Sequence, residues 1–295
     1  MPSALLLPLI DQARRSGFAL PSFNVFNLET ALAVVEAAEQ EHAPVVVAVA
    51  ELHFPFTDFE LLSSMLVRLA DRARVPVVLH LDHAQTLDVV VAAMRYGFTS
   101  FQFDGYGLPF EERIRLTRSV VDLAHSAGFA VEAELGHVTR VGTDAERRDQ
   151  LIADVDQAGR FSEATGIDVM AAAVGNVHGL RDGEGSIDFE LIRRLAAAIQ
   201  GTLSLHGGSG LSANDVARAV ELGVAKVSYY NNLGRAANEA MRAVLANEDP
   251  AFTDVMAAAK VAFAARVAER IRVFGASGQA DAPSGDASTV AVPVA

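Results

Sequence analysis

The 295-residue chain contains neither cysteine nor tryptophan, and the lack of cysteine removes several kinds of chemistry at once. It excludes disulfides, thiolate metal ligands and a cysteine nucleophile. No stretch approaches 18 uninterrupted apolar residues, and the first residues do not form a charged and then apolar signal peptide. We therefore expect a soluble, cytoplasmic protein.

Basic residues are also scarce. Lys and Arg number 24 against 37 Asp and Glu, which gives a formal net charge of −13, and no Lys/Arg run occurs. Such a surface repels the phosphates of nucleic acids and of anionic membranes, so we expect neither as a partner. The eight histidines are then the first place to look for chemistry.

Apolar stretches alternate almost regularly with amphipathic ones along most of the chain. We predict strands at 19–25, 44–50, 76–81, 99–103, 130–135, 168–174, 202–205 and 225–229. We predict helices at 28–41, 58–73, 86–96, 110–127, 152–165, 189–200, 212–222 and 233–246. Continuous apolar runs such as VVVAVA are typical of parallel strands covered on both faces. Eight strand–helix units in about 230 residues predict an α/β fold, a single (β/α)8 TIM barrel.

Two helices and a tail lie outside these eight units. Residues 5–16 predict an N-terminal helix that closes the barrel floor, and residues 249–274 predict an extra C-terminal helix. From Gly275 the composition predicts a disordered tail, 275–295, so that residues 1–274 form one domain. A doubly wound sheet is the alternative, but it would favour a glycine fingerprint after the first strand, where FNVFNLET has none.

Ionisable residues gather where the predicted strands end, and barrel active sites lie at the carboxyl ends of the strands. The residues at these ends are Asp82, His83, Asp104, Glu134, His178 and His206. Any one histidine could simply cap or pack. Three imidazoles at one level with an open position favour a catalytic zinc site instead.

The remaining histidines fit this site less well. His80 lies three residues before His83 on the same strand, so we expect it to face the opposite way and to serve packing. His42, His53 and His125 fall in helices or connections and are interpreted as surface or structural residues, while His137 stays undecided.

The run HGGSG at 206–210 precedes Ser212, a predicted helix N-cap. Gly207 and Gly208 allow backbone N–H groups to approach a ligand, and a helix N-terminus favours an anion. Barrels often bind phosphate in the loops after strands seven and eight. The run therefore predicts a phosphate-binding loop.

These motifs together resemble the class II, zinc-dependent ketose-bisphosphate aldolases, the family of fructose- and tagatose-bisphosphate aldolases. The matching segments cover nearly the whole predicted domain in family order: PSFNVFNLET, LHLDHAQT, GFTSFQFDG with LPFEERI, VEAELG, GNVHG, LHGGSG, ELGVAKV and IRVFGASGQA. The resemblance implies a lyase that reversibly cleaves a phosphorylated or related modified ketose. The products would be a dihydroxyacetone-phosphate-like ketone and an aldehyde.

The resemblance also implies roles for particular residues. His83, His178 and His206 correspond to the ligands of one Zn²⁺ per subunit, and Asp82 corresponds to the acid/base at the aldehyde oxygen. Glu134 and Asp104 correspond to carboxylates near alternative metal positions. Residues around the donor phosphate and a monovalent cation (Na⁺ or K⁺) correspond to Gly179, Gly207 and Ser209, and Asn24 corresponds to a group that reaches the far phosphate. A homodimer or homotetramer is implied as well.

The loop after the fifth strand, GHVTRVGTDAERRD, lacks the family's Gly-Gly-x-Glu-Asp pattern. Asp144 and Glu146 are its candidates for moving the donor proton, and a solvated surface loop is the alternative.

The sequence departs from the family around the substrate ends. At the end of the eighth strand the chain has KVSYYNN. Ser228, Tyr230 and Asn231 therefore replace groups that in the family normally hold the donor and its phosphate. Ala48 and Ala50 stand where the family commonly has Gln and Ser. We therefore hypothesise a modified ketose or sugar-acid phosphate, with at least one end recognised differently.

Other functions stay open. The same three histidines could serve hydrolysis or isomerisation through a metal-bound water. A non-catalytic barrel that binds a sugar phosphate is another alternative. A Schiff-base route has one candidate lysine near a strand end, Lys226.

Overall fold

The strands of the chain close into the predicted barrel. A computed structural model of the protein describes residues 3–105, 107–140 and 152–281. Its barrel strands pair in parallel in the order β1-β10-β9-β7-β5-β4-β3-β2. They are β1 Leu20–Asn24, β2 Val45–Ala50, β3 Val77–Ala84, β4 Ser100–Phe103, β5 Ala130–Leu135, β7 Val169–Ala172, β9 Thr202–Leu205 and β10 Val224–Tyr229. The predicted TIM barrel is thereby confirmed.

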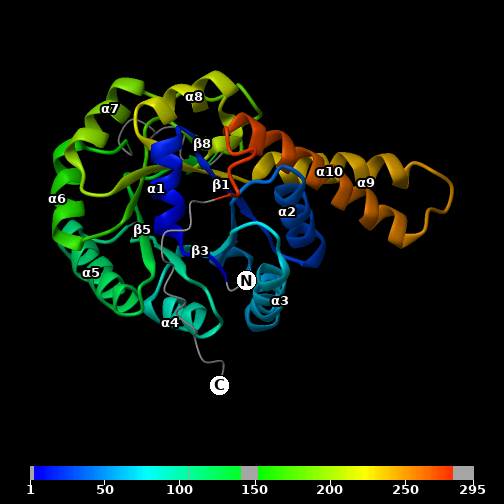
Figure 1. Cartoon of the computed structure of the whole chain (residues 1–295), viewed down its shortest axis with the longest axis horizontal. Coiled ribbons are helices and arrows are strands. Elements are labelled where there is room, and N and C mark those ends of the chain that lie inside the picture. The colour runs from blue at the N-terminus through cyan, green and yellow to red at the C-terminus, as the bar shows by residue number, and fades with distance from the viewer. Residues whose placement is uncertain (1–2, 106, 141–151, 282–295) are drawn as a thin grey trace.

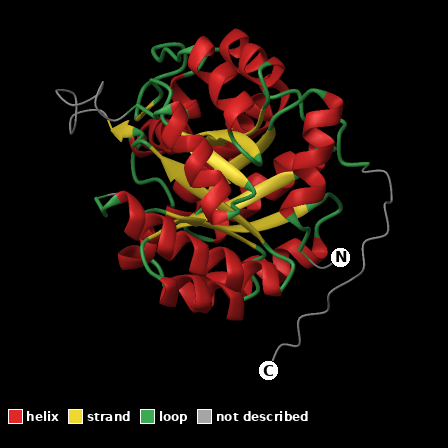
Figure 2. Ribbon diagram, turned by 90° about the vertical axis from the view of Figure 1, so that its left-hand side faces the viewer, coloured by secondary structure: helices red, strands yellow, loops and turns green. Residues whose placement is uncertain are grey.

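Helices surround this barrel (Figure 2). They are α1 Leu6–Ser16, α2 Leu28–Gln40, α3 Phe59–Arg72, α4 Leu87–Arg95, α5 Phe110–Ser126, α6 Val155–Thr165, α7 Phe189–Ala198, α8 Ala213–Glu221, α9 Asn231–Leu245 and α10 Phe252–Val273. Helix α8 begins where the sequence predicts: Ser212 is its N-cap and forms reciprocal hydrogen bonds with Asp215. Among the described residues, no helix is long and apolar enough to cross a membrane.

The amino ends of the strands form the floor of the barrel, and it is closed. Ala4, just before α1, donates its N–H to the carbonyl of Val77 at the start of β3, 2.8 Å away. Phe274, directly after α10, accepts from Ala19 before β1 at 2.9 Å. The predicted N-terminal helix thus covers this end together with the segment after α10.

The described chain stays ordered further than the composition suggested. Ala276 is completely buried, Gly278 donates to the carbonyl of Glu41, and Ala280 donates to that of His42. The expectation of disorder from Gly275 is therefore wrong for residues 275–281, because backbone hydrogen bonds to the end of α2 hold small residues that composition alone assigns to a tail. Residues 282–295 lie outside the described part.

Helices α9 and α10 pack against each other and project from one side of the barrel (Figure 1). Large apolar side chains are exposed on this hairpin, namely Leu245, Phe252 and Val261. A small two-stranded sheet, β6 Thr139–Arg140 with β8 Val177–His178, lies outside the barrel order. In the chain β6 comes after β5 and β8 comes after β7, so this small sheet lies at the carboxyl end of the barrel.

Candidate active site at the carboxyl end of the barrel

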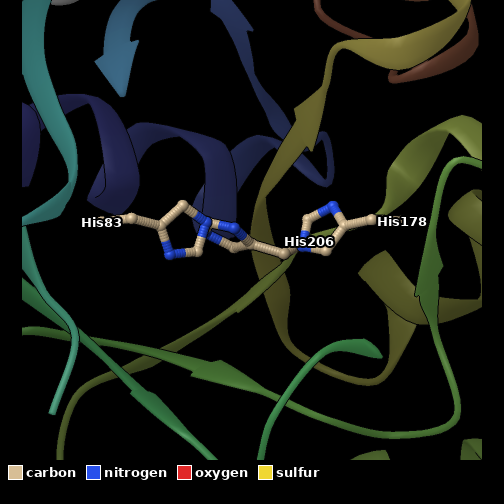
Figure 3. Close-up of side chains that lie close together, drawn as sticks. All are labelled: His83, His178 and His206. Atoms are coloured by element: carbon tan, nitrogen blue, oxygen red, sulfur yellow. The ribbon is translucent and has the colours of Figure 1, made fainter. Parts of the chain in front are cut away.

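Three histidines from separate parts of the chain meet at this end. His83 comes from β3, His178 from β8, and His206 directly follows β9. One ring nitrogen of each lies within 4.8 Å of the others. The ring centroids are 5.0 Å apart for His83 and His206, and 6.1 Å and 6.2 Å for the pairs with His178 (Figure 3). The structure thus brings together the trio that the sequence singled out.

An irregularity in β3 allows His83 to join this trio. The pairing of β3 with β4 shifts between Leu81 and Ala84, and His83 has φ of 56°. Few residues other than glycine adopt this conformation. Together with the register shift it interrupts the usual alternation of side chains between the two faces of the strand. Asp82 and His83 consequently both line the same pocket although they are adjacent in sequence.

His80 corrects our expectation about the face of this strand. It is completely buried in the barrel interior, where its Nδ1 lies 2.8 Å from Ser100 Oγ and its Nε2 lies 3.8 Å from Glu132. It therefore does not point away from the His83 side, because the register shift turns His83 inward as well. Burial, followed by the nearby Lys226 ammonium, lowers the pKa of His80 to about 3, so the ring is neutral.

Carboxylates surround His83 and make its position favourable for a cation. Asp104 Oδ2 lies 3.5 Å from Nδ1, and Asp82 Oδ1 lies 3.9 Å from Nε2. Burial opposes a charge here, but the carboxylates outweigh it and raise the pKa of His83 to about 10. The same field favours a metal cation in place of the proton. A nitrogen-rich set beside carboxylates fits Zn²⁺.

The two carboxylates that the resemblance places near alternative metal positions lie beside this nitrogen cluster but do not belong to it. Asp104 contacts His83, as described. Glu134 accepts from the backbone N–H of Val138 at 3.1 Å and lies 3.3 Å from His137 Nδ1. Among the described residues, neither carboxylate belongs to the set whose ligand atoms converge within 4.8 Å.

Asp82 is held as a carboxylate with a defined direction. The side-chain amide of Asn24, at the end of β1, donates to its Oδ2 at 2.7 Å. Burial would raise the pKa of Asp82, but the imidazoles of His83 and His206 outweigh it and hold that pKa below its ordinary value. An ionised carboxylate is a proton acceptor, so Asp82 is set up as a base beside the histidine trio.

A cavity of about 450 Å³ opens above the trio and contains most of the predicted substrate positions. Its lining includes five of the six, namely Asn24, Gly207, Ser209, Ser228 and Asn231. Gly179 is the exception: it is not among the lining residues, and its carbonyl accepts from Arg235 at 2.6 Å.

The glycine loop after β9 takes its shape from close backbone contacts. It forms a single 3-10 turn, Gly208–Gly210, directly before the Ser212 cap of α8. A Cβ on Gly208 would meet the carbonyl oxygen of Ser228 at 2.8 Å, and Gly207 has φ of 65°. The loop therefore needs glycine at both positions, and two of its residues, Gly207 and Ser209, line the pocket.

Three rings line one part of the pocket; sequence reasoning pointed to Tyr230 but missed Phe26 and His53. Phe26, His53 and Tyr230 all line the pocket, with ring centroids 5.3 to 6.3 Å apart in edge-on pairs. The interpretation of His53 as a surface or structural residue is therefore wrong in part. Its position in ELHFPF, directly after the second strand, was the available signal, because loops there face the active site.

Lys226 lies in the barrel interior and does not line the pocket. It is completely buried, and its Nζ donates to Glu132 Oε2 at 2.7 Å. Because this ion pair occupies the amine, the geometry gives no support to the Schiff-base route. The two loop candidates, Asp144 and Glu146, lie outside the described residues.

Comparisons with known proteins agree with this geometry. The family Fructose-bisphosphate aldolase class-II matches residues 5–279. The Escherichia coli K12 protein YdjI is 37% identical over 275 residues, which span 92% of this chain and 97% of the relative.

Solved structures give the same result. The crystal structure of the E. coli YdjI aldolase covers 95% of this chain and 100% of its own, with 34% identity and a TM-score of 0.84. The crystal structure of a putative fructose-1,6-bisphosphate aldolase from Coccidioides immitis matches 93% of this chain and 97% of its own chain, with 31% identity and a TM-score of 0.83. With the barrel and the histidine trio, these matches lead to one conclusion: the chain belongs to the class II fructose-bisphosphate aldolase family and is an aldolase.

Proposed function

We propose that the protein is a zinc-dependent aldolase that reversibly cleaves a ketose phosphate into a dihydroxyacetone-phosphate-like ketone and an aldehyde. The observation that carries this proposal is the placement of Asp82 beside His83, His178 and His206 in one cavity. The three histidines would hold Zn²⁺. When bound, the cation would act as a Lewis acid that stabilises negative charge developing on the donor half.

The chain's own residues would move the proton. In cleavage, Asp82 accepts the proton of the C4 hydroxyl, the C4 oxygen becomes the aldehyde carbonyl, and the electron pair of the breaking C3–C4 bond remains on the donor half. A further acid then protonates C3 to give the ketone; Asp144 and Glu146 are the candidates for this role, and both lie outside the described residues. In condensation, the protonated Asp82 returns that proton to the new hydroxyl. Asn24 directs the carboxylate through its 2.7 Å hydrogen bond. The backbone N–H groups of Gly207 and Ser209, the two residues of this loop that line the pocket, would receive the donor phosphate.

A direct test uses the purified protein. We expect about one zinc per subunit by elemental analysis and release of triose phosphate from a panel of ketose phosphates. Asp82→Ala should retain zinc and lose most cleavage. A folded protein that binds no zinc at neutral pH, or Asp82→Ala with full activity, would contradict the proposal.

The apolar lining of the pocket supports a modified substrate. It includes Phe26, Leu52 and Phe56, and no lysine or arginine is among the pocket residues in the described part of the chain. Ala50, where the family commonly has a polar residue, also lines the pocket. We propose a modified ketose or sugar-acid phosphate whose aldehyde end is recognised differently from a phosphate. Comparable turnover of fructose and tagatose bisphosphates at ordinary efficiency would count against this.

Two further features are proposed on the resemblance to the family. A monovalent cation, Na⁺ or K⁺, would assist binding of the donor phosphate near Gly207 and Ser209; activity in K⁺, Na⁺ and choline buffers tests this. A homodimer or homotetramer would cover the apolar side chains exposed on the α9–α10 hairpin. Analytical ultracentrifugation distinguishes these states from a monomer.

A further inference from the structure

One buried carboxylate connects the barrel interior to the histidine trio. Glu132, in the middle of β5, is completely buried and bonds to residues of two strands that are not its neighbours in the barrel. Its Oε1 accepts a hydrogen bond from Ser204 Oγ at 2.6 Å and lies 3.0 Å from His206 Nε2. Its Oε2 accepts a hydrogen bond from Lys226 Nζ at 2.7 Å. These bonds therefore cross the inside of the barrel.

This arrangement determines which ring nitrogen of His206 carries hydrogen. A carboxylate that is paired with an ammonium accepts hydrogen bonds only, so the nitrogen that faces Glu132 must be the donor. In a neutral imidazole the other nitrogen then has the free lone pair. Nε2 bonds to Glu132, and Nδ1 is consequently the nitrogen of His206 left to bind a metal.

The backbone beside His206 is fixed as well. Asn176 donates its side-chain amide to the His206 carbonyl at 2.8 Å, and Asn176 is itself buried. With the backbone and one ring nitrogen both held, the imidazole has little freedom to rotate. Outer partners of this kind commonly orient metal-binding histidines and strengthen their affinity for the ion.

Lys226 has a different task from Glu132. Its ammonium, also 3.4 Å from Ser228 Oγ, has no contact with the trio, but it balances the charge of Glu132. Without it, a carboxylate would remain in the interior without its counter-ion, which is strongly unfavourable. Lys226 and Ser204 thus hold Glu132, and Glu132 in turn holds His206.

We propose that Glu132 is a positioning residue that fixes the Nε2–H tautomer and the orientation of His206, so that Nδ1 faces the metal. The inference depends on the metal site proposed above for His83, His178 and His206. It also assigns Lys226 to this network, as the counter-ion of Glu132.

The first experiment reads the tautomer directly. Long-range ¹H–¹⁵N NMR spectra of full-length, zinc-loaded protein with ¹⁵N-labelled histidine should show hydrogen on Nε2 of His206 and none on Nδ1; His206→Gln identifies the signals. Hydrogen on Nδ1 would overturn the inference. If the protein binds no zinc, the metal proposal fails, but the metal-free spectrum still decides the tautomer.

The second experiment separates positioning from folding by replacing the buried pair in two ways. Glu132→Leu with Lys226→Met substitutes apolar groups of similar size, a change that many cores accept. It removes the acceptor of His206. We expect about 10- to 100-fold weaker zinc binding, measured by chelator competition on folded protein. Unchanged affinity in this variant would overturn the inference.

The matched variant restores the acceptor without the charges. Glu132→Gln with Lys226→Met leaves an amide oxygen for His206, so we expect zinc affinity to return to within a few-fold of the original. Equal affinities in the two pair variants would contradict positioning and indicate packing alone. Thr165→Ala serves as the control, because this buried hydroxyl bonds to the Phe161 carbonyl within α6, outside the Glu132 network, and its loss should leave zinc affinity unchanged.

Discussion

The two ends of the barrel use the same strands for opposite purposes. At the floor, Ala4, Phe274 and the segment after it seal the strand starts with backbone hydrogen bonds and apolar packing. At the carboxyl end, three histidines and Asp82 surround an open cavity. The difference indicates that stability and chemistry are separated along the barrel axis, so changes at either end should affect one property far more than the other.

Metal removal should give the largest effect on the catalytic end. Dialysis against a strong chelator is expected to reduce cleavage to background, because the described pocket residues include no lysine or arginine that could stabilise the donor charge in the metal's place. Zinc added back should restore the activity. Cleavage that persists in verified metal-free protein would contradict the role of the trio.

Asp82→Ala should have the next largest effect. We expect kcat to fall about 10²- to 10⁴-fold, the usual contribution of a positioned acid/base, while zinc content and thermal unfolding change little. Steady-state kinetics with metal analysis checks this. A large loss of stability instead would mean that the two ends are less separate than their structures indicate.

Phe18→Ala tests the floor. Phe18 lies two residues before β1 and is 1% exposed, and its Cβ would lie 3.4 Å from a Cβ built on Gly275. Its truncation should cost about 3–5 kcal/mol of unfolding free energy, through lost burial and the cavity left behind. The kcat of the remaining folded protein should be nearly unchanged; urea denaturation and kinetics at low temperature measure the two quantities.

Asn24→Ala should produce a smaller change at the catalytic end. It removes the 2.7 Å hydrogen bond that directs Asp82, so we expect about a tenfold lower kcat, in line with one bond to a charged group. Asn24→Asp is a useful companion, since a second carboxylate would repel Asp82 and lower the rate further. An unaffected kcat in both variants would exclude Asn24 from directing the base.

Arg74→Ala should have the smallest effect, although it also lies at the floor. The Arg74 side chain is 80% exposed in its ion pair with Glu39, and exposed pairs contribute less than about 1 kcal/mol. Thermal unfolding should barely change. A large loss would mean that charge pairs, as well as apolar packing, hold this end together.

The sequence predicted the barrel and the histidine trio because both depend on local patterns. Eight apolar runs separated by helical periodicity specify the strand count, and strand ends in a parallel barrel meet at one rim. The ordered segment 275–281 was not predictable in this way, because its hydrogen bonds go to residues far away in the chain, at the end of α2.

The role of Glu132 and the fact that His80 and His83 both face the barrel interior were missed for related reasons. The pattern VEAEL drew attention to Glu134, yet a glutamate in one apolar strand and Lys226 in another were the available signal of a pair across the interior. The orientation of His83 depends on a register shift with β4, and no residue pattern within β3 reveals the partner's offset.

The positive φ at His83 has a consequence for how the site tolerates motion. The proton acceptor and one metal ligand are joined by a single peptide unit, so any displacement of β3 carries both together. The planar peptide fixes the distance between their two Cα atoms, while the backbone angles on either side of it, including the positive φ of His83, set how the two side chains face each other. A change in those angles would therefore alter the carboxylate and the imidazole together.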